Sequence, residues 1–245
     1  MKKILIILIL ILSVFSVANA HPFKSEKELY DYYAEIDKKI FTEKNKPIIR
    51  KKYPRKLTDK ELEQEQIPFS LKRYTVDEIV GNNKLVYNAF NYQLMSISQI
   101  NENNKEEGVI RTFDEDENLI SIAYIENSKG VMGIYREYYP WGVLKNETPY
   151  YTSEINGKLK NYYPDGLLKE EYTYYNNKKE GLATMYYESG KKFAIENYKN
   201  DLKNGDYYMY YENGNLGMKA FFVNGKREGT IEFYEEDGKK IEKNK

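Results

Sequence analysis

The C-terminal half of the chain repeats with a period of 24 residues, and this period constrains the fold more than any other feature. Two glycine positions mark the period from residue 133 onward. The first glycine column is made of Gly133, Gly157, Gly181, Gly205 and Gly229. The second column is made of Gly142, Gly166, Gly190, Gly214 and Gly238. Because ten of the 15 glycines fall in these columns, we expect equivalent units that stack side by side.

Aromatic residues follow the same period. One column is made of Tyr138, Tyr162, Tyr186, Tyr210 and Tyr234. The neighbouring column is made of Tyr139, Tyr163, Tyr187 and Tyr211. A third column is made of Tyr150, Tyr174, Tyr198 and Phe222. Eighteen of the 26 tyrosines lie between residues 135 and 234, so stacking the units in register lines up aromatic rings along the array.

Each unit has the sequence pattern of a β-hairpin. In the unit that begins at Gly205, residues 206–212 are rich in tyrosine, which favours strands. Asn213-Gly214 predicts a tight turn, and residues 216–223 form the return strand. No connection is long enough for a crossover helix, so neighbouring strands must pair antiparallel. The sequence therefore predicts a mainly β fold, an elongated antiparallel β-meander of 24-residue hairpin repeats with a small α-helical N-terminal segment.

The repeat array is expected to span residues 81–245. Gly108 begins an earlier unit that is one residue longer, and a more degenerate unit starts at Gly81. Side chains alternate along a strand, so Tyr208 and Tyr210 should face one way and Tyr207 and Met209 the other. Both faces of the predicted sheet therefore carry aromatic residues.

Residues 1–20 have the pattern of a secretory signal. Two lysines precede an apolar run from residue 4 to 17, and Ala18-Asn19-Ala20 is a small-x-small cleavage site. The run is shorter than the roughly 20 apolar residues of a membrane-spanning helix, so we expect cleavage after Ala20, with retention as an anchor as the alternative. No later stretch is apolar enough to cross a bilayer. These features predict a periplasmic, secreted or cell-surface protein without a transmembrane segment after cleavage.

Residues 21–80 are expected to form an α-helical cap or linker before the array. Ser25 and Glu28 have capping-box spacing, and an apolar stripe at helical spacing follows them. A second capping box at 58–61 predicts a short helix that ends at Pro68. The basic stretch 50–56 between them is interpreted as a solvated linker, with contact to anionic lipid or glycan as the alternative.

Composition excludes several classes of protein. Without the two N-terminal lysines, 36 basic residues stand against 38 acidic ones, which argues against nucleic-acid binding. The chain has no cysteine and a single histidine, His21, so histidine-based catalysis and zinc sites are excluded. Acidic clusters such as Glu170-Glu171 and residues 114–117 are interpreted as solvated turn charges, and the latter run lacks the ligand spacing of a calcium loop. We therefore expect a non-enzyme with no catalytic residue, metal or cofactor.

The repeat resembles a known family. The pattern of glycine, paired tyrosines and a second glycine in residues 157–166, 181–190 and 205–214 is similar to the bacterial variant of the MORN repeat. The resemblance covers roughly residues 108–242 and implies an elongated antiparallel β array. It also implies protein interaction and, in eukaryotic members, membrane association. Many bacterial members are labelled antitoxins of toxin–antitoxin systems, but an antitoxin normally meets its toxin in the cytoplasm, which an exported chain leaves.

The expected function is binding by exposed aromatic rings. The predicted binding residues are Tyr138, Tyr162, Tyr186, Tyr210, Tyr234 and Trp141. Tyrosine offers a large rigid contact area and a hydroxyl, so the first hypothesis is a scaffold that binds an unidentified protein at the cell envelope. The alternative hypothesis is a glycan- or cell-wall-binding module whose rings stack on sugars. A structural interpretation also stays open, in which the columns form the core and stacking ladder of the sheet and Trp141 packs a turn.

Overall fold

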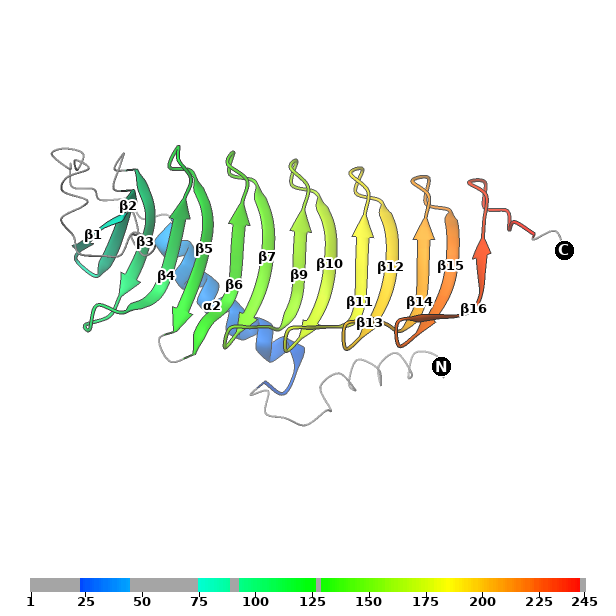
Figure 1. Cartoon of the computed structure of the whole chain (residues 1–245), viewed down its shortest axis with the longest axis horizontal. Helices are drawn as coiled ribbons and strands as arrows, with labels where there is room; N and C mark the ends of the chain where they lie inside the picture. Colours follow the sequence, from blue (N-terminus) through cyan, green and yellow to red (C-terminus); the bar gives the residue numbers. More distant parts are fainter. Residues whose placement is uncertain (1–22, 45–74, 89–92, 127–128, 243–245) are drawn as a thin grey trace, which may run out of the picture.

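The described part of the chain forms one long antiparallel sheet with a single helix against it (Figure 1). The computed structural model describes residues 23–44, 75–88, 93–126 and 129–242. The expected signal, the basic stretch and the second expected helix lie outside these ranges. The predicted mainly β fold and its hairpin repeats are confirmed.

The sheet follows chain order from one end to the other. Its strands are β1 (Thr75–Val80), β2 (Asn83–Asn88), β3 (Leu94–Ile100), β4 (Glu106–Phe113), β5 (Leu119–Glu126), β6 (Gly130–Tyr138), β7 (Leu144–Tyr151), β9 (Gly157–Tyr162), β10 (Leu168–Tyr175), β11 (Lys178–Tyr186), β12 (Lys192–Lys199), β14 (Gly205–Tyr210), β15 (Leu216–Val223) and β16 (Lys226–Phe233). The two-residue strands β8 (Glu154–Ile155) and β13 (Leu202–Lys203) pair with β7 and β12. The sheet begins at Thr75, so it starts one strand before the expected boundary at residue 81.

Two kinds of turn alternate at the two edges of the ribbon. At one edge, two-residue turns such as Asn224-Gly225 place both residues at positive φ, 48° and 79°. At the other edge, the turn predicted at Asn213-Gly214 forms, and it is longer than two residues. The Tyr211 amide donates to the Asn215 carbonyl at 2.8 Å, and only Gly214 has positive φ, 92°. The Asn213 side chain instead accepts the Asn215 amide at 2.8 Å, which explains the preference for asparagine there.

Side chains tie each hairpin to the next at both edges. Near the glycine turns, the phenols of one tyrosine column donate to main-chain carbonyls of the following unit, as Tyr187 does to Tyr210 at 2.7 Å. The other members of this column, Tyr139, Tyr163 and Tyr211, repeat the bond at 2.8 to 3.0 Å. At the opposite edge, the Asn204 side chain accepts the amide of Asn224 at 3.1 Å. Asn156 accepts the amide of Asn176 in the same way. The interpretation of this tyrosine column as a structural ladder is therefore confirmed.

The helix α2 (Glu26–Lys44) crosses one face of the sheet. The Ser25 hydroxyl caps it by accepting the Glu28 amide at 3.2 Å. Its buried stripe consists of Leu29, Tyr33, Ile36 and Ile40. Figure 1 shows α2 running obliquely behind the strands from β9 towards β4. The helix was expected to cap the first unit, but it lies across strands in the middle of the array because only a sheet face offers an apolar surface wide enough for its stripe.

The core lies between α2 and the strands beneath it. One cluster joins Ile36 and Ile40 to residues of β4 to β6, namely Val109, Ile122, Met132 and Tyr138. A second cluster, made of Leu85, Tyr87, Leu94 and Ile97, lies within β2 and β3. We call the side of the sheet that carries α2 the helix face and the other side the open face.

Candidate functional site

The helix face divides into two halves with different surroundings. In the covered half, from β4 to β9, the side chains pack under α2. In the free half, from β10 to β16, none of the described residues packs on the face. Arg136 and Tyr138 lie on the helix face, so residues that follow them by a multiple of 24 lie on it too. A residue that pairs with one of these in an adjacent strand lies on the same face. The apolar and aromatic residues of the free half include Leu182, Tyr186, Ile195, Leu202, Tyr208, Tyr210, Phe221 and Val223.

A buried ionic cluster fastens α2 to the covered half. The Arg136 guanidinium donates two hydrogen bonds to the Asp37 carboxylate, at 2.8 and 2.7 Å, and one to Glu147 at 3.0 Å. It also lies over the ring of Phe41, with 5.3 Å between Cζ and the ring centroid. The Tyr162 phenol donates to the second carboxylate oxygen of Glu147 at 2.8 Å. Burial, followed by this hydrogen bond to a carboxylate, raises the pKa of the Tyr162 phenol.

Two tyrosines of α2 add hydrogen bonds to the sheet backbone. The Tyr33 phenol donates to the Asn156 carbonyl at 2.8 Å. The Tyr30 phenol oxygen accepts the Lys158 amide at 2.8 Å. The helix is therefore positioned by main-chain groups as well as by apolar contacts.

The predicted tyrosine column is split between the two halves. Tyr138 is only 9% exposed and belongs to the core under α2, and Tyr162 is half-buried in the ionic cluster. Tyr186, Tyr210 and Tyr234 are half-buried in the free half, where the Tyr234 phenol donates to Glu232 at 2.6 Å. The structure therefore does not bring the five residues together as one exposed row. A binding role remains a prediction for each of them, and the surroundings favour the three in the free half.

Trp141 lies at the edge of the ribbon with 60% of its surface exposed. Its indole stacks on Tyr139, with centroids 4.8 Å apart and planes 6° from parallel, and its Nε1 donates to the Pro164 carbonyl at 3.1 Å. A shallow pocket of about 330 Å³ brings Trp141 and Tyr138 together with Asn118 and Leu119. The tryptophan is thus held in one orientation while it remains accessible to a ligand.

The open face carries a ladder of tyrosines and lysines that sequence reasoning missed. The Lys179 ammonium lies over the rings of Tyr172 and Tyr198, at 3.8 and 5.1 Å from their centroids. The Lys203 ammonium contacts the buried carboxylate of Glu196 at 2.6 Å. The signal was present in the sequence, because Lys179 and Lys203 are one period apart. Since these lysines already have partners on the sheet, the ladder stabilises the array.

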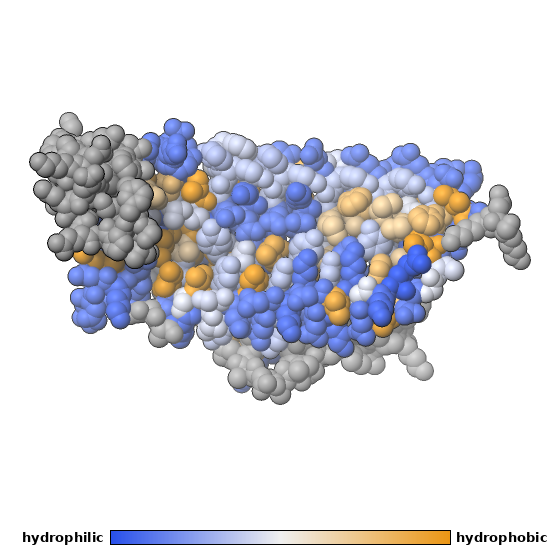
Figure 2. Space-filling view, viewed as in Figure 1, coloured by the Kyte–Doolittle hydropathy of each residue, from blue (hydrophilic) through white to orange (hydrophobic). Residues whose placement is uncertain are grey.

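The hydropathy of the open face changes along the array. Figure 2 shows this face, with hydrophilic side chains over the middle of the sheet and more hydrophobic ones over β11 to β15. Ala183, Ala194 and Ala220 are buried there between larger neighbours. The neighbouring side chains cover these alanines, whereas Phe233, which pairs with Met218 on the same face, is 40% exposed.

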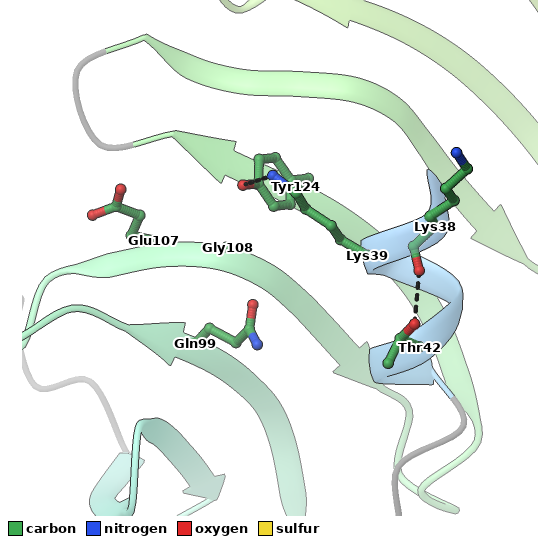
Figure 3. A pocket seen from close by; sticks show the side chains of 7 residues that line it. All are labelled: Lys38, Lys39, Thr42, Gln99, Glu107, Gly108 and Tyr124. Atoms are coloured by element: carbon green, nitrogen blue, oxygen red, sulfur yellow. Dashed lines mark hydrogen bonds between the residues drawn. The ribbon is translucent and has the colours of Figure 1, made fainter. Parts of the chain in front are cut away.

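A polar pocket of about 530 Å³ lies where the C-terminal end of α2 meets β3 to β5 (Figure 3). Lys39 donates to the Tyr124 phenol at 3.2 Å and lies 5.1 Å from its ring centroid. The Gln99 side-chain oxygen accepts the Val109 amide at 2.7 Å. The contact of Lys39 with Tyr124 holds the helix end on the sheet, and that of Gln99 with Val109 joins β3 to β4. Across the described residues, no group of three or more acidic or histidine side chains could hold a metal ion.

Comparison with known proteins identifies the repeat. The MORN repeat variant matches residues 155–177, 179–200 and 203–224, which are three consecutive hairpin units of the array. No curated protein sequence matches the chain significantly. No helix among the described segments has the length and apolar character needed to cross a membrane.

Two solved structures share a remote likeness with the chain. One is a crystal structure of TarM, with 12% identity over 83% of this chain and 28% of that chain, and a TM-score of 0.18. The other is a point mutant of S. aureus TarM in complex with fondaparinux, alpha-GlcNAc-glycerol and UDP, with 12% identity over 83% of this chain, 29% of that chain and a TM-score of 0.18. The chain spans less than a third of the length of these proteins, and likeness at this level carries no argument about function.

Proposed function

We propose that this chain is an exported protein-interaction scaffold of the bacterial cell envelope, and that its partner binds the free half of the helix face. Export rests on the signal pattern of residues 1–20. Protein binding is supported by the MORN repeat variant matches, because repeats of this kind commonly bind proteins or membranes.

The exposed apolar side chains of the free half carry this proposal. Leu182, Leu202, Phe221 and Val223 are 51%, 48%, 45% and 39% exposed. In the covered half the apolar residues of the same face are buried or partly buried under α2, as at Ile122, which is 0% exposed. An exposed apolar patch on an otherwise polar protein is typical of a binding surface. Neighbouring tyrosines such as Tyr210 add contact area at low cost in side-chain entropy.

The proposal is tested by cross-linking in the cell. A photoreactive phenylalanine analogue placed at Phe221 should form a specific adduct with an envelope protein, whereas the same analogue at Asn213, on the turn edge, should not. The substitution Tyr210→Ala should reduce the adduct with only a modest loss of stability, because Tyr210 is half-buried. Absence of an adduct at Phe221, or a mature protein that retains residues 1–20 and stays in the cytoplasm, would contradict the proposed function.

A second candidate function is glycan binding at Trp141. The exposed indole is oriented by Tyr139 and Pro164, and the adjoining pocket offers the Asn118 side chain for a hydrogen bond to a sugar. Retention of the chain on purified cell wall, lost in Trp141→Ala and competed by soluble glycan, would favour this candidate. Retention that does not depend on Trp141 would reject it.

A further inference from the structure

The polar pocket at the C-terminal end of α2 is a concave site that none of the roles assigned so far uses. We call it the helix-end pocket. Figure 3 shows its walls, in which α2 supplies Lys39 and Thr42, and β3, β4 and β5 supply Gln99, Glu107 and Tyr124. Its volume of about 530 Å³ lies within the range of small-molecule sites, which is about 300–1,000 Å³. The size of the pocket is therefore compatible with a small ligand.

The Gln99 side chain is held in one orientation in this pocket. Its oxygen accepts the Val109 amide at 2.7 Å. The side chain also lies against Gly108, where a Cβ atom would collide with the Gln99 oxygen. The Gln99 side-chain nitrogen makes no hydrogen bond to any residue that the structure describes. The pocket therefore contains a fixed amide with hydrogen atoms to donate.

The Glu107 carboxylate is fixed by the turn between β3 and β4. One of its oxygens accepts the Asn101 side-chain nitrogen at 2.9 Å. The Asn101 side-chain oxygen in turn accepts the main-chain amides of Asn103 and Lys105. The second carboxylate oxygen of Glu107 has no hydrogen-bond partner in the described segments. Glu107 therefore provides an unused acceptor whose position is set by the turn.

The position of Glu107 has a different role in later units. There, the residue before the glycine that begins the unit accepts a main-chain amide 20 residues further on, as Glu180 does from Asn200 and Asn204 from Asn224. The bond that the structure shows for Glu107 comes from the β3–β4 turn instead. This carboxylate is thus not part of the ladder that joins later units.

Tyr124 and Lys39 complete the polar lining. Lys39 donates to the Tyr124 phenol oxygen at 3.2 Å, so the phenol hydrogen is left for a ligand. Figure 3 shows that the neighbouring Lys38 side chain points away from these groups, and its ammonium pairs with the exposed carboxylate of Glu35. The polar groups of the pocket are therefore one ammonium, one carboxylate, one amide and one phenol.

This combination of groups favours a neutral ligand that is rich in hydroxyls. A hydroxyl both donates and accepts, so a sugar can use the Gln99 nitrogen as a donor and the Glu107 oxygen as an acceptor. An inorganic anion would be repelled by the Glu107 carboxylate. An apolar ligand would displace water from the amide and the carboxylate without replacing its hydrogen bonds.

We propose that the helix-end pocket binds a small neutral sugar. Gln99 donates to one sugar hydroxyl and Glu107 accepts from another, while Lys39 and the Tyr124 phenol donate to further hydroxyl oxygens. This inference is independent of the proposed partner surface, because the pocket lies over β3 to β5 and the free half begins at β10. The site is also separate from the Trp141 pocket, with which it shares no lining residue.

Saturation-transfer difference NMR of the full chain with D-glucose tests the proposal. We expect saturation of the protein to reach the ring protons of glucose. Cyclohexanol has the same ring size but one hydroxyl, and as a competitor it should leave the glucose signal unchanged. Inorganic phosphate is the anionic competitor and should also leave the signal unchanged.

Two pairs of variants locate the bound sugar. Thr42→Trp fills the side of the pocket formed by α2 and should abolish the glucose signal. Ala34→Trp adds the same side chain at an exposed position of α2 outside the pocket and should retain the signal. Glu107→Ala removes the acceptor and should weaken glucose binding about tenfold, whereas Glu106→Ala, next to it but outside the pocket, should have no effect.

Several results would overturn the sugar site. One is a glucose signal that is absent, or that is equal in Thr42→Trp, Glu107→Ala and the unchanged protein. Another is displacement of glucose by phosphate or by cyclohexanol. A signal lost in Trp141→Ala but retained in Thr42→Trp would place the sugar in the other pocket and also reject the proposal. Circular dichroism checks the fold of each variant, and Glu107→Ala decides the question if Thr42→Trp does not fold.

Discussion

Replacing Arg136 by methionine should detach α2 from the sheet. The guanidinium is 8% exposed and makes three hydrogen bonds to the carboxylates of Asp37 and Glu147, which are 19% and 17% exposed. Methionine retains the apolar contact with Phe41 but leaves two carboxylates side by side without their cation. Removing one partner of a buried ionic cluster typically costs about 3–5 kcal/mol, and the low exposure of all three groups places this cluster in that range.

The measurement combines urea denaturation with hydrogen exchange of the α2 amides. In Arg136→Met we expect the free energy of undocking α2 to fall by about 3–5 kcal/mol. The triple variant Asp37→Leu, Arg136→Met and Glu147→Gln should recover most of this loss, because it removes both uncompensated charges and keeps an acceptor for Tyr162. Lys27→Met, in the exposed pair with Asp31, should have no measurable effect.

Two results would contradict an anchoring role of the ionic cluster. A cost below about 1 kcal/mol for Arg136→Met would show that the cluster behaves like an exposed ion pair. A triple variant as unstable as the single one would show that the loss comes from packing and not from unpaired charge.

Three other predictions concern the array and its helix. Tyr187→Phe removes one hydrogen bond to the Tyr210 carbonyl and should lower the free energy of unfolding by about 1 kcal/mol in denaturant titration; no change would remove the tyrosine ladder as a stabilising element. Gly133→Ala and Gly181→Ala impose the same backbone strain, but only the former also meets α2, so its melting temperature should fall further; equal losses would contradict the helix contact. Burial raises the pKa of the Tyr30 phenol to about 12, so its contribution to stability should be complete below about pH 10 and decline as pH rises towards 12. The free energy of unfolding of Tyr30→Phe should fall less steeply over this pH range. An unchanged slope would contradict the raised pKa of Tyr30.

The fold followed from local signals in the sequence. The glycine columns, the turn residues and the tyrosine-rich strands each act over a few residues, and 24-residue spacing repeats them in register. The alternation of Tyr207 to Tyr210 between faces was also predicted correctly, because it depends only on strand geometry. The sequence placed a turn at Asn213-Gly214 but did not determine its length, because this pair fits a two-residue turn as well as the longer one that forms.

The candidate site depended on a contact between distant parts of the chain. The sequence presented Tyr138, Tyr162, Tyr186, Tyr210 and Tyr234 as five equivalent residues, and it contained the amphipathic stripe of α2. It did not indicate which units the stripe would cover, since every unit offers the same glycine and tyrosine positions.

Residues that differ from the repeat pattern determine which units α2 covers. Met132 packs against Ile36 and Arg136 binds Asp37, and the equivalent positions in later units hold other side chains. The sequence by itself therefore determined the ribbon and its period, because a hairpin and its pairing with the next unit depend only on residues that are close in the sequence. Tertiary structure decided which tyrosines are buried, because their burial depends on which strands α2 packs against, and α2 lies more than 90 residues away in the sequence.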